Sequence, residues 1–239
     1  MVSLFRLRVV VDVMQEASAA RSPRQFLEGE RDNPPCLRFF EIDDARNDTS
    51  RVEAPDEEAL AAEYRDVQAA AAYLRSQPRV DASRIGIYGG SYGGYLTALA
   101  LARNSDLFAA GVDIHGVHDW TTERARGMLE RQRYEQAPDV AAALDTAWRS
   151  SPVSSVGTWR SPVLLIHGDD DRNVRFAQST DLARRLAAAK VPFETLVIPD
   201  DTHHFLRYAN IVTVDKAAAA FLERQLLQAH AEATRATGP

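Results

Sequence analysis

Residues 84–95, RIGIYGGSYGGY, join a β-branched run to a glycine-rich turn, and an alanine- and leucine-rich segment follows as far as Ala102. This order predicts a strand, a sharp turn with Ser91 at its apex, and a helix. A serine in this position is held in a strained backbone conformation and exposes its hydroxyl beyond the end of the strand. Ser91 is therefore a candidate nucleophile. The alternative is a glycine-rich loop that only connects two elements.

The glycines around Ser91 have a steric explanation. Gly89, Gly93 and Gly94 leave space where the chain passes close to itself on both sides of the serine. The turn also places the amide of Tyr92 at a helix N-terminus, where it can donate to a developing oxyanion. The sequence thus predicts Tyr92 as an oxyanion donor.

A serine hydroxyl needs a base and an orienting carboxylate, in the chain order Ser, Asp or Glu, His. Two apolar runs, 162–167 and 193–198, predict strands that are followed by polar loops. The first loop contains aspartates 169–171, and the second contains His203 and His204. Because the carboxyl ends of parallel strands lie along one edge of a sheet, an aspartate and a histidine from these loops can meet Ser91.

The serine segment, the His-Gly-x-x-Asp-x-x-Val loop and the Pro-Asp-x-x-His-x-Phe loop together resemble the catalytic domain of the prolyl oligopeptidase family of serine peptidases. This family includes dipeptidyl-peptidase and acylaminoacyl-peptidase branches. The resemblance implies that Asp171 is the acid, because it is the fourth residue after His167, and that His203 is the base. His204 stands where the family usually has glycine.

The resemblance extends over about residues 55–227. It implies an α/β-hydrolase fold, in which a mostly parallel sheet is flanked by helices, and a catalytic domain over 55–239. Asp119-Trp120 matches a family segment beside the substrate pocket. Trp120, Asn173 and Val174 are therefore expected to line that pocket.

Residues 1–54 depart from the family and form an atypical N-terminal segment, so the upstream strands of the fold are incomplete or atypical. No part of this segment matches the His/Tyr-Gly-Gly-Pro-type motif that completes the family's oxyanion hole. Only 4–13 and 37–42 have weak strand patterns. Two alternatives follow for the exposed edge of the nucleophile strand: these residues pair with it, or a second copy of the chain does in a homo-oligomer.

The rest of the chain predicts helices at 55–76, 120–136, 138–149, 177–189 and 211–230. In the first of them, the apolar residues recur at spacings of three and four, which is typical of a helix packed on a sheet. Acidic residues occupy its opening turn, as the helix dipole favours.

Composition is that of an ordinary soluble protein. The 239 residues suffice for one domain of this class, and 45% of them are hydrophobic. A net charge of -6 argues against nucleic acid or an anionic membrane as partner. Cys36 is the single cysteine, and neither a signal peptide nor a transmembrane segment is indicated. These features predict a cytoplasmic protein.

Metal-binding alternatives are weak at the sequence level. Aspartates 169–171 lack the glycine and distal glutamate of a calcium loop. Residues 200–204 offer aspartates and histidines, but zinc requires a third or fourth ligand at suitable spacing. His115 and His118 are expected to be structural or pocket-wall residues. The sequence therefore predicts neither a metal nor a cofactor.

Together these features predict a serine hydrolase that cleaves peptide bonds through an acyl-enzyme. Two alternatives stay open. One is a carboxylesterase for small esters, because the chain has no room for the family's β-propeller. The other is a catalytically impaired remnant that keeps the motifs without a complete oxyanion site.

Overall fold

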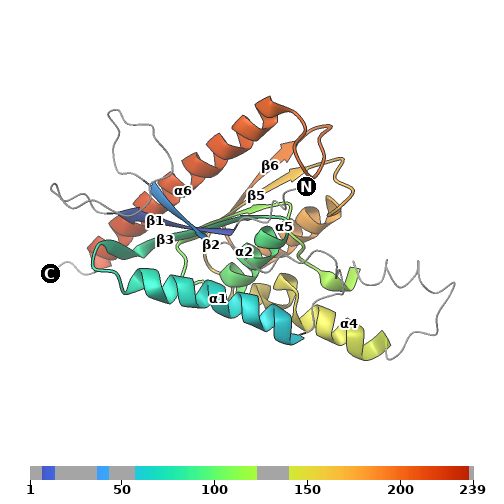
Figure 1. Ribbon diagram of the computed structural model, residues 1–239, viewed down its shortest axis with the longest axis horizontal. Coiled ribbons are helices and arrows are strands. Elements are labelled where there is room, and N and C mark those ends of the chain that lie inside the picture. The colour runs from blue at the N-terminus through green and yellow to red at the C-terminus, as the bar shows by residue number, and fades with distance from the viewer. Residues whose placement is uncertain (1–6, 14–36, 43–56, 123–139, 237–239) are drawn as a thin grey trace.

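The computed structural model describes residues 7–13, 37–42, 57–122 and 140–236. Its centre is a six-stranded sheet with the strand order β2-β1-β3-β4-β5-β6 (Figure 1). The strands are β1 (Leu7–Val13), β2 (Leu37–Ile42), β3 (Val80–Gly90), β4 (Ala110–Ile114), β5 (Val163–Gly168) and β6 (Phe193–Ile198).

Strands β3 to β6 are parallel to one another, as the apolar runs predicted. All residues of β4 and β5 are buried, because helices cover both faces of the sheet. β4 begins at Ala110, since Phe108 and Ala109 lie in the bend that enters it. The mostly parallel α/β fold expected from the sequence is confirmed.

Within the described residues, helical segments flank the sheet on both faces. They are α1 (Glu57–Arg75), α2 (Tyr92–Arg103), α4 (Val140–Arg149), the 3-10 helix η1 (Pro152–Thr158), α5 (Ala177–Ala189) and α6 (Tyr208–Ala236). One core cluster joins α1, α2, η1 and α5 to the sheet, and a second joins α6 to the opposite face. Figure 1 accordingly shows α6 above the strands and α1, α2 and α4 below them.

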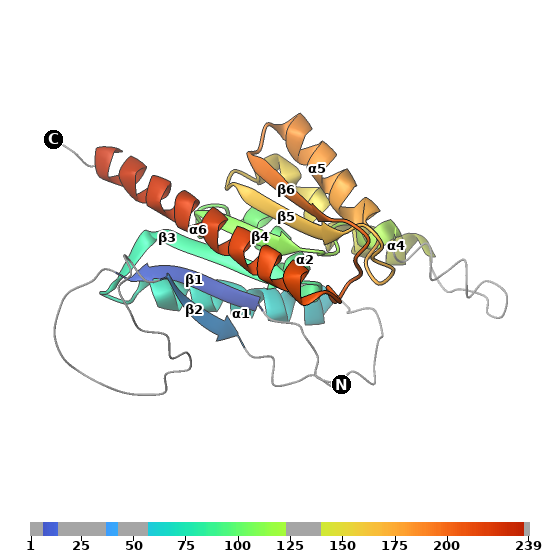
Figure 2. The same cartoon turned by 90° about the horizontal axis from the view of Figure 1, so that it is seen from above.

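The two N-terminal strands complete the sheet on the side of the nucleophile strand. β1 lies between β2 and β3 and is antiparallel to both. Leu7 is opposite Gly89, and Val13 is opposite Val80, so the amino end of β1 lies beside the carboxyl end of β3. Figure 2 shows β1 alongside β3. Of the two alternatives for this edge, the structure has the first, in which the chain's own N-terminal residues pair with β3.

The described helices have the predicted bounds to within a few residues, except for α6. α5 has the predicted bounds, whereas α6 is longer at both ends than the predicted 211–230. Of the helix expected at 120–136, only 120–122 lie within the described residues, and Cys36 lies outside them. None of the helices in the described ranges combines the length and apolarity needed to cross a bilayer.

Candidate active site

Ser91 lies at the turn between β3 and α2, with φ 57° and ψ -115°. This backbone conformation is strained for a residue with a side chain, and it is fixed on both sides. The Ser91 amide donates to the carbonyl of Ile114 at 2.8 Å, and its carbonyl accepts from the amide of Tyr95 at 3.0 Å. A Cβ at Gly89 would lie 2.2 Å from the carbonyl oxygen of Gly93, so the turn has room only for glycine at this position, as predicted.

The structure brings Ser91, His203 and Asp171 into one hydrogen-bonded series. Ser91 Oγ lies 2.9 Å from His203 Nε2, and His203 Nδ1 lies 2.6 Å from Asp171 Oδ2. His203 and Asp171 are buried, at 8% and 6% exposure. The alternatives that the sequence left open, Asp169, Asp170 and His204, are exposed.

Asp171 is held by four donors. Its Oδ1 accepts the amides of Asn173 at 2.8 Å and Val174 at 3.0 Å, while Oδ2 faces His203 and also His167 Nε2 at 3.2 Å. Burial opposes ionisation of Asp171, but the hydrogen bonds from His167 and His203 outweigh it and hold the pKa of the carboxyl well below its usual range. Asp171 is therefore a carboxylate throughout the neutral and mildly acidic range.

His167 extends this series away from Ser91. Its Nε2 lies 3.0 Å from the carbonyl of Val174, which can only accept, so Nε2 bears the proton. Nδ1 then accepts from the Ser179 hydroxyl at 2.7 Å. A protonated Nε2 also points a donor at Asp171, which gives the carboxylate a second imidazole partner.

The loop that contains His203 is fixed by Asp201. Asp201 Oδ1 accepts the amides of Thr202 at 2.8 Å and Leu206 at 2.9 Å, and Oδ2 accepts from Asn210 Nδ2 at 2.6 Å. Asp201 is only 1% exposed, so these bonds are shielded from water. The loop that contains His203 is thus anchored to the first turn of α6.

Aromatic side chains form one wall beside Ser91. The rings of Tyr92 and Tyr95 are 5.3 Å apart, and those of Tyr95 and Trp120 are 5.4 Å apart. The Tyr92 hydroxyl donates to Glu63 on α1. Of the expected pocket residues, Trp120 belongs to this wall, Val174 is buried beside Asp171, and the Asn173 side chain is exposed.

His115 also lies beside this site. Its contact with His203 was not predicted from the sequence. It follows β4 with φ 43°, and its ring centroid lies 4.1 Å from that of His203. Phe205 lies on the same ring, with centroids 5.3 Å apart. The available signal was its position directly after a buried strand, at the same sheet edge as Ser91.

Comparison with known proteins agrees with this arrangement. The profile of the prolyl oligopeptidase family matches residues 54–229. The chain belongs to the prolyl oligopeptidase family.

Curated relatives in this family include peptidases of two names. Dipeptidyl peptidase 4 of Sus scrofa is 35% identical over 125 residues, and prolyl endopeptidase FAP of Homo sapiens is 33% identical over 125 residues. Each match covers 52% of this chain and 16% of the relative. The matched part is therefore a small share of these longer proteins.

Solved structures of family members have a similar fold. Dipeptidyl peptidase 4 of Porphyromonas gingivalis superposes with a TM-score of 0.59 at 28% identity, over 70% of this chain and 23% of that one. A puromycin-hydrolyzing peptidase of Mycobacterium tuberculosis has a TM-score of 0.60 at 27% identity, over 69% of this chain and 26% of that one. Acylaminoacyl peptidase of Pyrococcus horikoshii has a TM-score of 0.59 at 28% identity, over 69% and 28%.

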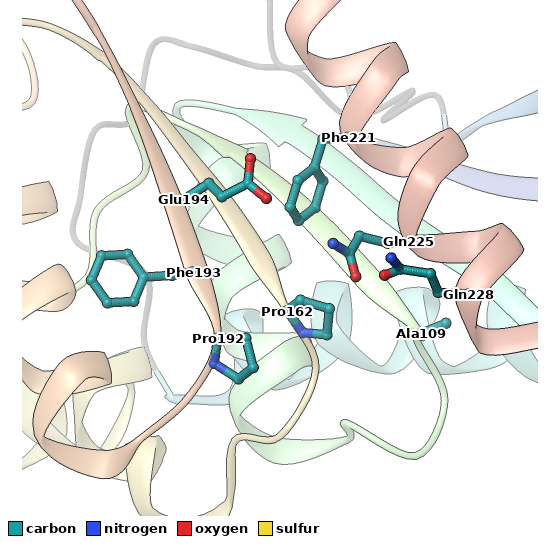
Figure 3. Close-up of a pocket in the computed structure, with 8 residues that line it drawn as sticks. All are labelled: Ala109, Pro162, Pro192, Phe193, Glu194, Phe221, Gln225 and Gln228. Carbon is teal, nitrogen blue, oxygen red and sulfur yellow. The ribbon is translucent and has the colours of Figure 1, made fainter. Parts of the chain in front are cut away.

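A pocket of about 440 Å³ lies where β4, β5 and β6 begin, at the opposite edge of the sheet from Ser91. Figure 3 shows the residues that line it. Pro162 and Pro192 enter it just before β5 and β6, and Phe221 and Gln225 reach it from α6. It is separated from Ser91 by the length of the parallel strands. This pocket is therefore separate from the candidate active site.

Proposed function

We propose that this chain is a serine hydrolase of the prolyl oligopeptidase family that cleaves peptide bonds through an acyl-enzyme. The observation on which this depends is the series of hydrogen bonds from Ser91 Oγ to His203, at 2.9 Å, and from His203 to Asp171, at 2.6 Å. A serine, an imidazole and a buried carboxylate in series are the parts that nucleophilic acyl transfer requires.

Each residue has a role that follows from its contacts. Asp171 accepts a hydrogen bond from the Nδ1–H of His203, which leaves the Nε2 lone pair facing the Ser91 hydroxyl. As Ser91 Oγ bonds to the substrate carbonyl carbon, its proton moves to His203 Nε2. The same proton then passes to the leaving amine, and water repeats the sequence to release the acyl group.

Tyr92 supplies the oxyanion donor in this proposal. Its amide is the first of α2, directly after the strained Ser91, where the helix dipole favours negative charge. One such donor contributes about 3–4 kcal/mol to transition-state stabilisation. Tyr95 of the aromatic wall is fully buried, so Tyr92 and Trp120, which are half-buried, would contact an apolar substrate side chain beside the scissile bond.

The substrate class follows from the relatives. Their names describe dipeptidyl, prolyl and acylaminoacyl peptidases, so short peptides or acylated peptides are the proposed substrates.

Labelling of the purified chain with a fluorophosphonate probe tests the nucleophile. The wild type should be labelled and should hydrolyse aminoacyl-nitroanilides, whereas Ser91→Ala should lose both properties. Ser76→Ala, which changes an exposed serine after α1, is the matched control and should behave as wild type. Persistent labelling of Ser91→Ala would remove the assignment. Hydrolysis of p-nitrophenyl esters without any hydrolysis of anilides would indicate a carboxylesterase instead.

A further inference from the structure

Asp113 is an ionisable residue in a strand that is otherwise apolar. All five residues of β4 are buried, and Asp113 is only 1% exposed. A strand covered on both faces normally consists of apolar residues, because a buried charge is costly unless it is paired. In the register of the sheet, Asp113 is opposite Gly89, two residues before Ser91. Proteins depart from such local rules mainly at functional sites, so the position of Asp113 beside the nucleophile is informative.

His118 is the side-chain partner of Asp113. Its Nε2 lies 2.5 Å from Asp113 Oδ2, its ring is fully buried, and within the described residues its Nδ1 has no hydrogen-bond partner. Burial opposes a charge on His118, but the charge and hydrogen bond of Asp113 outweigh it and raise the pKa of the imidazole. A buried pair of this kind adds little net stability compared with apolar residues of the same volume, so stability alone does not explain it.

Asp113 also closes the turn that follows β4, residues 114–116. Its Oδ1 accepts the amide of Gly116 at 3.0 Å. The same oxygen lies under the first turn of α2, where a Cβ on Gly94 would be 2.6 Å from it. A Cβ on Gly116 would in turn lie 2.6 Å from the carbonyl carbon of Gly94. The turn is therefore packed directly against the backbone at the start of α2.

This turn contacts both the nucleophile and the base. The carbonyl of Ile114 accepts the amide of Ser91 at 2.8 Å. The ring of His115 lies against that of His203, with centroids 4.1 Å apart and an angle of 35° between the planes. A displacement of the turn would therefore move Ser91 and His203 together.

His118 connects the turn to two helical segments. Its amide donates to Gln178 Oε1 on α5 at 2.9 Å, and its carbonyl accepts the amide of Val153 on η1 at 3.3 Å. Because its ring also holds Asp113, the pair links the turn to the helical layer beneath the sheet. Locked outer contacts of this kind are what keeps catalytic side chains in a productive geometry.

We propose that Asp113 and His118 are positioning residues for the candidate active site. The pair holds the turn 114–116 in place, and the turn keeps Ser91 Oγ and His203 Nε2 at their reactive distance of 2.9 Å. Neither residue of the pair belongs to the series of hydrogen bonds from Ser91 to Asp171. The effect on turnover rests on the function proposed above.

Steady-state hydrolysis of an anilide substrate by two variants of Asp113 tests this role. Asp113→Ala removes the acceptor of the Gly116 amide and should lower kcat by ~10²-fold, since small misplacements of reacting groups have costs of this order. KM should change by less than about threefold, because substrate binding is not affected. Asp113→Asn keeps an oxygen for Gly116 and offers its amide to His118, so kcat should recover to within about fivefold of wild type.

Leu226→Ala is the matched control. Leu226 is 1% exposed on α6, on the opposite face of the sheet, so its truncation destabilises the fold without touching the turn. Its kcat should stay within about twofold of wild type. If Asp113→Ala does not fold, Asp113→Leu/His118→Phe replaces the pair with apolar groups and should show the same loss of kcat. A loss no larger than that of Leu226→Ala, or no recovery in Asp113→Asn, would overturn the proposal.

NMR of the histidine rings separates this proposal from the proposed function. In Asp113→Ala, or in the double variant, the ring resonances of His203 should shift, because the His115 ring beside it moves. They should not shift in Leu226→Ala. A wild type without turnover whose His203 resonances shift on Asp113→Ala would refute the peptidase activity alone. Unshifted His203 resonances would refute the positioning role alone, whatever the activity of the wild type.

Discussion

Backbone strain is concentrated around the candidate nucleophile. Non-glycine residues with positive φ in the described ranges include Ser91, His115, Asp200 and Phe205, and each lies in a loop at the carboxyl end of a strand. Each such residue costs about 1–3 kcal/mol unless its surroundings compensate. Here the compensation comes from buried hydrogen bonds, such as that from the Ser91 amide to Ile114. The four strained residues lie at the sheet edge that contains the site.

Gly94 is one of the glycines at this edge that leave no room for a side chain. A Cβ there would lie 2.6 Å from Asp113 Oδ1, 2.8 Å from Gly116 Cα and 2.9 Å from the carbonyl oxygen of Ile114. Two of these are backbone atoms, so Gly94→Ala should destabilise the fold by about 1–3 kcal/mol and displace Ser91. Denaturant unfolding measures the loss. Gly157→Ala, where no atom lies within 4 Å of the added methyl, should change stability by less than about 1 kcal/mol.

Asp171 should make stability dependent on acidity. Its folded-state pKa is lowered, so the native chain binds fewer protons at this group than the unfolded chain does. The resulting stabilisation is complete above the unfolded pKa, near 3.8, and is lost as the pH falls through the lower folded value. Between pH 5 and pH 3, the unfolding free energy of the wild type should therefore fall more steeply than that of Asp171→Asn. Parallel slopes for the two proteins would refute this linkage.

At the scale of single residues, the sequence was informative for candidate catalytic residues in the loops directly after strands. The loops that contain Ser91, Asp171 and His203 could be placed because each follows a predicted strand, and their meeting needs only a parallel sheet. The choice of Asp171 and His203 within their loops came from the resemblance to the family. The contact of His115 with His203 could not be predicted, since it depends on the path of one loop across the sheet edge.

Among the elements, the loop between β6 and α6 has the most direct influence on the base. Asp201 fixes this loop through Thr202, Leu206 and Asn210. Asp201→Ala should lower kcat by about 10²-fold with little change in KM, because a small displacement of His203 costs proximity rather than substrate binding. Steady-state hydrolysis of an anilide substrate measures this.

Asp170→Ala is the control for that experiment. Asp170 is exposed, and its contact with Arg172 at 3.3 Å is also exposed, so turnover should stay within about twofold of wild type. An Asp201→Ala enzyme with normal kcat would show that the loop is held by other contacts.

The elements themselves followed from periodicity to different degrees. α5 was predicted to the residue, because Leu182 and Leu186 repeat at helical spacing and Lys190 ends the helix in a left-handed conformation. α6 extends past its predicted bounds since its first turn, Tyr208–Asn210, is mostly exposed and has no apolar repeat. The pairing of β1 with β3 could not be predicted, because hydrophobic pattern does not choose a partner strand.

For the whole molecule, self-association stays a prediction. The outer strands of the described sheet are β2 and β6, and Val197 on β6 is 41% exposed. We expect copies to associate through β6, so sedimentation velocity should show a larger species as concentration rises. Val197→Lys should reduce that species, whereas Tyr73→Lys, on the exposed face of α1, should not. Sedimentation as a monomer at all concentrations would refute the expectation. The cytoplasmic location likewise stays a prediction.

The reversed direction of β1 has a practical consequence for handling this protein. Since Leu7 is opposite Gly89, the described amino end of β1 lies at the same sheet edge as Ser91, so an affinity tag or surface linker fused upstream is expected to be brought toward that edge. α6, by contrast, runs toward the far side of the sheet, where Gln225 and Gln228 lie beside Pro162. Immobilisation through the C-terminal end should therefore leave the sheet edge with Ser91 accessible to probes, whereas an amino-terminal fusion would obstruct it.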